Sequence, residues 1–235
     1  MIPRRIAPTI LEDSKSYAVV AILGARQAGK TTLARWLFPD HAYANLEDPQ
    51  TARFAKDDPR GFLRDGERRM IIDEFQRVPE LLSQVQAIVD ARGKPGWYIL
   101  TGSQNVLMSE RIGQSLAGRV ALFTLPTLSI EGLDAVGLVA SDRDQQIRKG
   151  FFPRLYEHPT EVGRYYRNYI QTYVERDVRT VRNVADLSSF QDFLRLLAGR
   201  VGRIVNLSSL GNDAGVSHNT AKSWIGILEA GYVIR

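Results

Sequence analysis

The sequence contains no cysteine. This absence excludes disulfide bonds, cysteine-ligated zinc and thiol catalysis, and it fits a reducing cytoplasm, where we expect the chain to work. No apolar run approaches the roughly 18 residues that a membrane-spanning helix needs, so we expect no membrane contact. The basic start of the chain, Met1 to Arg5, is not followed by the apolar segment of a signal peptide.

Histidine is also scarce, and its three positions, His41, His158 and His218, are too scattered to form a metal cluster. The 235 residues, 44% apolar and 24% charged, are enough for a buried sheet and a second, smaller module. The net charge of +5 suits phosphate-bearing partners, but many proteins that touch no nucleic acid share it, so it decides little.

Strands and helices alternate in the first half of the sequence. Buried-strand patterns occupy residues 17–23, 43–46, 70–72, 97–100 and 120–125, and helical patterns lie near the chain start and at 30–38, 49–63 and 79–92. This alternation predicts a parallel α/β sheet. After Pro126 the patterns are helical, near 129–138, 162–182, 188–200, 208–214 and 218–230. The α/β part therefore ends between residues 126 and 160.

A glycine-rich segment separates the first strand pattern from the helix that follows it. Its sequence, GARQAGKT at 24–31, is the Walker A pattern G-x-x-x-x-G-K-T. The glycines let backbone N–H groups face phosphate oxygens, the lysine reaches the β- and γ-phosphates of ATP, and the threonine hydroxyl ligates Mg²⁺. A chance glycine-lysine turn lacks this strand–helix context. The predicted ATP-binding residues are Gly24, Ala25, Arg26, Gln27, Ala28, Gly29, Lys30, Thr31 and Thr32.

Two acids follow the third strand pattern. Asp73 is expected to hold Mg²⁺ together with Thr31, and Glu74 is placed to polarise an attacking water. An acidic strand end without function is common, but the preceding Walker A favours the Walker B interpretation. The adjacent glutamate also favours hydrolysis over phosphate transfer by a small-molecule kinase.

Polar residues end the fourth strand pattern, and an arginine precedes the fifth. Ser103 is the first candidate to orient the water, followed by Thr101 and Asn105, while the alternative is a simple strand-ending turn. Arg119 could stabilise transition-state charge, in cis or in a neighbouring subunit, or it could be a surface residue.

Together these motifs resemble the AAA-type ATPases of the AAA_14 family that are joined to a DUF4143 region. The matching segments are GARQAGKTTLARWL (24–37), NLEDP (45–49), MIIDEFQRVPELL (70–82), YILTGSQN (98–105), SLAGRV (115–120), TYVERDV (172–178) and LSSLGNDAGVSHNTAKSWIGILEAGYV (207–233). The chain departs from the family at Phe151, where a second glycine is usual.

The resemblance implies an ASCE-type P-loop NTPase core at 1–126, a helical lid with connecting helices at 127–185, and a winged-helix module at 186–235. It also implies a further region of nuclease-like fold. We therefore expect this chain to be truncated inside the wing of the winged helix.

Residues 208–230 have the pattern of a helix-turn-helix, with Ser217 as a helix N-cap. One face of the second helix is predicted to be buried through Ala221, Trp224, Ile225 and Leu228, and His218, Asn219, Lys222 and Ser223 lie nearer the other side. Those polar residues could contact DNA, or the module could serve packing or homo-oligomer contacts. With one lysine and an acidic Glu229, the exposed face is poor in the charge that phosphate contacts need.

The helix pattern at 162–182 interleaves tyrosines with arginines. It could form a nucleic-acid surface with stacking rings, but an amphipathic helix with packed tyrosines and solvated or paired arginines is the favoured interpretation. The function favoured overall is a Mg²⁺-dependent ATP hydrolase that passes its nucleotide state to the helical tail. The alternatives are an ATP-gated DNA-binding regulator with little turnover and a P-loop kinase.

Overall fold

The computed structural model describes residues 1–103, 112–174 and 187–234. They form two compact units, Met1–Thr160 and Glu161–Arg235. Within the described residues, no helix combines the length and apolar character needed to cross a membrane. The division of the chain into parts ending at residues 126 and 185 stays a prediction.

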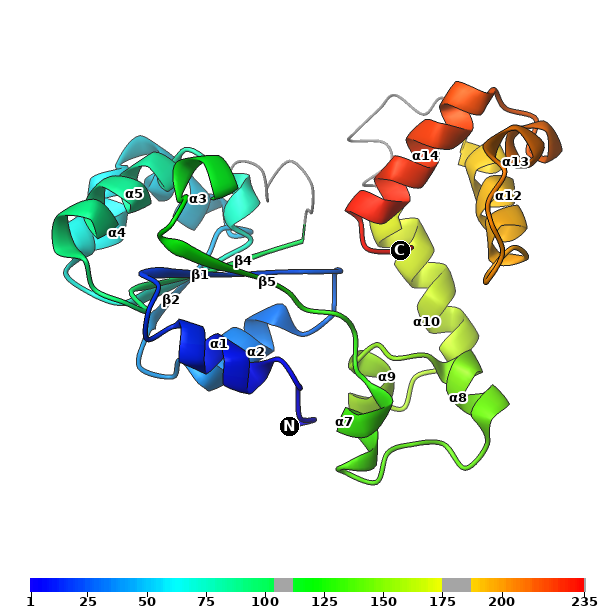
Figure 1. The fold of residues 1–235 in the computed structure, drawn as a ribbon, viewed down its shortest axis with the longest axis horizontal. Coiled ribbons are helices and arrows are strands. Elements are labelled where there is room, and N and C mark those ends of the chain that lie inside the picture. The colour runs from blue at the N-terminus through cyan, green and yellow to red at the C-terminus, as the bar shows by residue number, and fades with distance from the viewer. Residues whose placement is uncertain (104–111, 175–186, 235) are drawn as a thin grey trace. The chain divides into compact units, whose positions relative to one another are not determined.

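A five-stranded parallel sheet forms the centre of the first unit (Figure 1), as the alternating patterns predict. Its strands are β1 (Val19–Leu23), β2 (Ala42–Asn45), β3 (Met70–Asp73), β4 (Tyr98–Gly102) and β5 (Val120–Thr124). Their order in the sheet is β2-β3-β4-β1-β5. Since β4 lies between β1 and β3, the carboxyl ends of the phosphate-loop strand, the acidic strand and the polar strand meet at one edge.

Helices cover both faces of this sheet. Figure 1 shows α1 (Ala7–Asp13) and α2 (Lys30–Leu37) on one face, and α3 (Pro49–Asp57), α4 (Pro59–Leu63) and α5 (Leu81–Arg92) on the other. Two 3-10 turns, η1 (Arg64–Gly66) and η2 (Phe75–Arg77), precede and follow β3. Coverage on both faces explains why β1 reads as a continuous apolar run: each of its five residues is buried.

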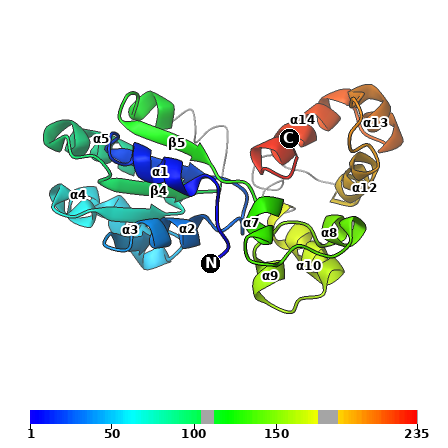
Figure 2. The same cartoon turned by 60° about the horizontal axis from the view of Figure 1, so that its bottom comes forward.

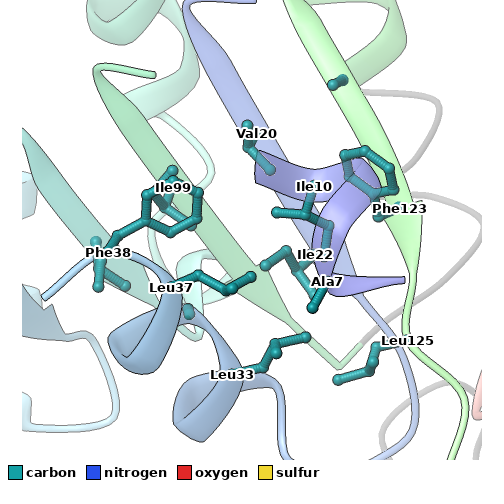
Figure 3. Close-up of a cluster of buried hydrophobic side chains, with 13 residues drawn as sticks. Ala7, Ile10, Val20, Ile22, Leu33, Leu37, Phe38, Ile99, Phe123 and Leu125 are labelled. Carbon is teal, nitrogen blue, oxygen red and sulfur yellow. The ribbon is translucent and has the colours of Figure 1, made fainter. Parts of the chain in front are cut away.

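The core beneath α1 and α2 fixes the phosphate-loop helix against the sheet. Ile22 of β1, Leu33 of α2 and Phe123 of β5 belong to one buried cluster (Figure 3). Alternate residues of β1 and of β5 enter this cluster, as the two-residue period of a strand requires. The first turns of α2, which carry Lys30 and Thr31, are therefore held at a fixed position over the strands.

Three short helices follow β5 in the first unit: α7 (Ile130–Asp134), α8 (Arg143–Lys149) and α9 (Arg154–Glu157) (Figure 2). The predicted helix near 129–138 is confirmed as the shorter α7. Neither α8 nor α9 shows a helical apolar pattern. They are linked instead by Gln146 of α8, a buried side chain that donates to Gly150 O and to the Tyr156 hydroxyl of α9 and accepts from Ala140 N–H.

The second unit is helical, with α10 (Val162–Tyr169), a π-helical turn η3 (Ile170–Val174), α12 (Leu187–Ala198), α13 (Leu207–Asp213) and α14 (His218–Ala230). The predicted helix over 162–182 is confirmed only in part, because residues 175–182 lie outside the described residues. The ring of Trp224 lies edge-on to Phe190 and Phe193 at 5.2 and 5.1 Å. This aromatic cluster joins α14 to α12.

Helices α13 and α14 are joined by a tight turn. A Cβ atom on Gly211 would lie 2.9 Å from Val216 O, so only glycine lets the turn approach α13 this closely. Ser217 caps α14 by accepting from Thr220 N–H, as predicted. The predicted buried face is corrected at one position: Ile227 is buried and Ile225 only partly so. The wing stays a prediction.

Candidate functional site

The phosphate loop takes the conformation that its glycines allow. Gly24 has φ 153°, Gln27 has φ 59° and Gly29, the residue before α2, has φ 93°. A Cβ atom on Gly24 would lie 2.3 Å from Leu125 O, because Leu125 N–H donates to Leu23 O at 2.7 Å and brings the two chains together. The loop is thus packed directly against the end of β5, and residue 24 must be glycine.

Lys30 is buried inside the loop, with 5% of its surface exposed. Its ammonium donates to Ala25 O at 2.9 Å and to Gly24 O at 3.1 Å. Burial lowers the pKa of Lys30, and the nearby carboxylates of Glu74 and Asp73 oppose that shift. A buried cation at the start of a helix, facing backbone carbonyls, is suited to bind a polyanion.

Asp73, buried at the end of β3, accepts hydrogen bonds from three hydroxyls. Thr31 Oγ1 lies 3.0 Å from Oδ1 and 2.8 Å from Oδ2, Tyr43 OH lies 2.8 Å from Oδ2, and Thr101 Oγ1 donates to Oδ1. The predicted pair Thr31 and Asp73 is thus brought together. A hydroxyl and a carboxylate are oxygen donors of the kind Mg²⁺ prefers, so these residues fit the ion. Among the described residues no group of three or more His, Cys, Asp or Glu offers another metal site.

Glu74 and Ser103 are also brought together, through Gln76. Gln76 Nε2 donates to Glu74 Oε2 at 2.5 Å and to Ser103 Oγ at 3.1 Å, and Ser103 Oγ donates to Glu74 Oε2 at 3.3 Å. Glu74 has a left-handed backbone, φ 54° and ψ 41°, a conformation that costs about 1–3 kcal/mol in a residue other than glycine. The Glu74 carboxylate thus has hydrogen-bond partners different from those of Asp73. Asn105 lies outside the described residues, and Thr101 contacts Asp73 rather than Glu74.

Arg4 is a site residue that the sequence analysis missed. Its Nη2 donates to Ala28 O at 2.7 Å and to Pro126 O at 2.6 Å, while Nη1 is buried and has no hydrogen-bond partner among the described residues. Burial lowers the pKa of Arg4 to about 10. Its only sequence signal is its place in the basic start of the chain, and its partners are 24 and 122 positions away.

A cavity of about 330 Å³ opens over the phosphate loop within the first unit. Its lining includes Lys30, Thr31 and Glu74 together with Arg4, and this volume is in the range of small-molecule sites. The α9 region adds a second wall: Pro153, Arg154, Glu157 and His158. Arg154 is exposed and forms no ion pair within the described part of the chain. No motif signalled these residues, because nothing in the sequence shows that α9 returns to the loop.

Arg119 is not brought to this cavity in its own chain. It precedes β5 at the amino edge of the sheet, whereas the phosphate loop follows β1 at the carboxyl edge. Its guanidinium forms a two-point ion pair with Asp90 of α5 and donates to Ala117 O. The hydrogen bond to Asp90 raises the pKa of Arg119.

The tail presents little positive charge on α14. His218, Asn219 and Lys222 are exposed, as expected for the face opposite Trp224, and Glu229 is exposed with them. On α10, Tyr165 and Tyr169 are buried and pack ring against ring, and Arg167 lies 3.7 Å from Glu161. The two packed tyrosines, the paired Arg167 and the exposed Arg164 agree with the amphipathic-helix interpretation of the described part of 162–182.

Comparison with known proteins assigns most of the chain to two regions. A family model described as an AAA domain matches residues 16–133. A second model, described as a domain of unknown function (DUF8612), matches residues 140–235, which corrects the expectation of a DUF4143 region. The helical pattern of the tail could not distinguish the two families, because many small helical modules share such a pattern.

Two curated relatives, both uncharacterized proteins, come from Mycobacterium bovis and Mycobacterium tuberculosis. Each is 31% identical over 241 residues, covering 100% of this chain and 53% of the relative. The chain therefore spans about half the length of the curated relatives it matches.

A similar solved structure is the Walker-type ATPase of Pyrococcus abyssi, with a TM-score of 0.63, 17% identity, and coverage of 98% of this chain and 89% of that chain. At this identity the likeness shows a shared fold. The AAA-domain model, by contrast, matches half of the chain and includes the phosphate loop, Asp73 and Glu74. The chain therefore belongs to the AAA_14 family of AAA domains.

Proposed function

We propose that the chain is a Mg²⁺-dependent ATP hydrolase of the AAA type. The observation that carries the proposal is the paired arrangement at the end of β3. Asp73 is held against Thr31, and the next residue, Glu74, is held apart from it by Ser103 and Gln76. A metal-holding acid and a water-activating acid need such separate surroundings, because one must bind a cation while the other accepts a proton.

The phosphate loop accounts for nucleotide binding. Residues Gly24 to Thr32 would cradle the phosphates, and Lys30 would exchange its bonds to Gly24 O and Ala25 O for phosphate oxygens. Thr31 and Asp73 would hold Mg²⁺, which neutralises phosphate charge when bound. The buried Nη1 of Arg4, which has no hydrogen-bond partner in the part of the chain that the structure describes, would supply one more donor at the cavity wall.

The remaining residues would act on the attacking water and on the transferred charge. Glu74 would accept the proton of the water, and Ser103 would orient the water or the glutamate. Arg154, exposed at the cavity wall, would face the phosphates from the side opposite the loop. Arg119 would serve the site of a neighbouring subunit in a homo-oligomer, because its own site is at the other edge of the sheet.

A second function, an ATP-gated DNA-binding regulator with little turnover, is favoured by the helix-turn-helix packing of α13 and α14. The exposed His218, Asn219 and Lys222 would then contact DNA. The sparse charge of that face favours the hydrolase, since phosphate contacts dominate DNA affinity.

Phosphate release tests the proposal. The chain should release phosphate from ATP steadily in Mg²⁺ without an added acceptor. Lys30→Ala should lose ATP binding in calorimetry and all release. Lys56→Ala, on the exposed side of α3, is the matched control and should behave as wild type. Tight ATP binding without release, combined with ATP-dependent retention on DNA, would support the regulator instead.

A further inference from the structure

Asp73 has a hydroxyl partner that does not belong to the phosphate loop or to the neighbouring strand β4. Tyr43 of β2 donates to Asp73 Oδ2 at 2.8 Å. Thr101 of β4 donates to Oδ1 from the other side. Each carboxylate oxygen is thus held by a different strand, and the plane of the carboxylate is fixed between them.

The register of the sheet explains how Tyr43 reaches this position. Tyr43 pairs with Ile71, so its side chain lies on the same face of the sheet as Ile71 and Asp73. The long phenol spans the two-residue offset to the end of β3. The Arg35 guanidinium of α2 lies 4.9 Å from the ring centroid, which holds the ring over the sheet.

We propose that Tyr43 is a positioning residue for the candidate magnesium site, acting through Asp73. This inference rests on the proposed function of the same site. Tyr43 fixes the rotation of the Asp73 carboxylate so that one of its oxygens stays directed at the ion beside Thr31. A tyrosine hydroxyl is protonated near neutral pH, so it acts as a donor to this carboxylate.

If Tyr43 positions Asp73, removal of its hydroxyl should change Mg²⁺-dependent ATP binding, whereas a packing role would change the stability of the fold. Tyr43 as a whole residue is 38% exposed and lies outside the buried core, so removing only its hydroxyl leaves the packing of the core intact. Partners that orient a metal-holding carboxylate typically contribute about 10–100-fold to metal affinity. Loss of the hydroxyl should therefore raise the Mg²⁺ concentration that is needed to strengthen ATP binding. The affinity for ATP without Mg²⁺ should stay unchanged.

The test compares Tyr43→Phe with Tyr17→Phe, a matched control at the amino end of β1. ATP affinity is measured by calorimetry in EDTA and across a Mg²⁺ titration. Mg²⁺ should increase the affinity of the chain for ATP, and for Tyr43→Phe we expect the Mg²⁺ concentration at half of this increase to rise about tenfold. The ATP affinity in EDTA and the midpoint of thermal unfolding should stay as in wild type. Tyr17→Phe should match wild type throughout.

If the wild-type chain binds ATP, either of two results would contradict the role of Tyr43 while leaving the proposed function in place. One is a Mg²⁺ titration of Tyr43→Phe identical to that of Tyr17→Phe. The other is an equal loss of ATP affinity in EDTA and in Mg²⁺, which would mark a structural role. A wild-type chain that binds no ATP would instead overturn the proposed function, and this inference with it.

Discussion

The hydroxyl of Thr31, on the first turn of α2, donates to both carboxylate oxygens of Asp73, 42 positions later at the end of β3. The two halves of the candidate magnesium site are therefore already in contact. This contact depends on the core under α2, where Leu33 and Ile71 belong to one buried cluster.

Thr31→Val should weaken ATP binding in Mg²⁺ by about 10–100-fold, because valine keeps the shape of threonine but offers no oxygen. Affinity in EDTA should change much less. Thr31→Ser retains the hydroxyl and is the control, so it should stay near wild type. Calorimetric titration in both buffers measures the difference. Equal behaviour of the valine and serine variants would contradict a role in holding the ion.

Glu74→Gln should keep ATP binding and reduce hydrolysis by at least about a hundredfold, the usual scale for losing a general base. Gln76→Ala should reduce turnover about tenfold, since misplacing a catalytic group lowers the rate without removing it. Glu80→Gln, exposed beside α5, is the control. Phosphate release under saturating ATP measures all three. Near wild-type turnover in Glu74→Gln would exclude this residue as the base.

Gly24→Ala should destabilise the first unit by roughly 2–5 kcal/mol, because its Cβ would meet Leu125 O and its φ disfavours a side chain. Gly93→Ala is the matched control. It also has positive φ but nothing within 4 Å of the added carbon, so strain alone should cost about 1 kcal/mol. Chemical denaturation measures both. If the two variants lose equal stability, the contact with β5 is not what requires glycine at residue 24.

Local patterns predicted the parts of the site that are continuous in sequence. The phosphate loop and the Asp73-Glu74 pair each lie in a short segment whose residue types suit their chemistry. Ser103 was a candidate because polar residues end the fourth strand pattern, and the structure places its hydroxyl 3.3 Å from Glu74 Oε2. Its role in orienting the water stays a prediction.

The parts that were missed depend on where distant segments meet. Tyr43 reaches Asp73 only because of the β2–β3 register, and Arg4 reaches Pro126 O across 122 positions. The residues around α9 that line the cavity have no apolar pattern from which their place beside the phosphate loop could be predicted. Side-chain partners of this kind are set by tertiary packing, which a single sequence does not display.

Arg119→Ala should lose turnover by roughly a thousandfold if its guanidinium serves a neighbouring subunit, with little change in ATP affinity. Mixing this variant with Lys30→Ala should then restore some activity. Asp90→Ala is an informative control, because it removes the ion pair but keeps the guanidinium. Its turnover should stay near wild type. Equal effects of Arg119→Ala and Asp90→Ala, without rescue on mixing, would leave Arg119 a purely structural residue.

DNA binding by this chain should be weak and independent of sequence. The exposed face of α14 carries Lys222 and the acidic Glu229, and few phosphate contacts can form with one cation. Fluorescence anisotropy with duplexes of different sequence at physiological salt measures the affinity. Lys222→Ala should lower it about equally for all of them. A sub-micromolar complex with one sequence would show that the α13–α14 pair reads bases.

The burial of β1 has a consequence for how nucleotide could move this protein. Both edges of the strand are paired and its residues are at most 1% exposed, so its amide protons should exchange with solvent only on global unfolding. The phosphate loop therefore follows a strand that we expect to stay fixed in the native state. We therefore expect hydrogen exchange to respond to nucleotide first around Pro153 and Arg154, which line the cavity outside the sheet and the phosphate loop.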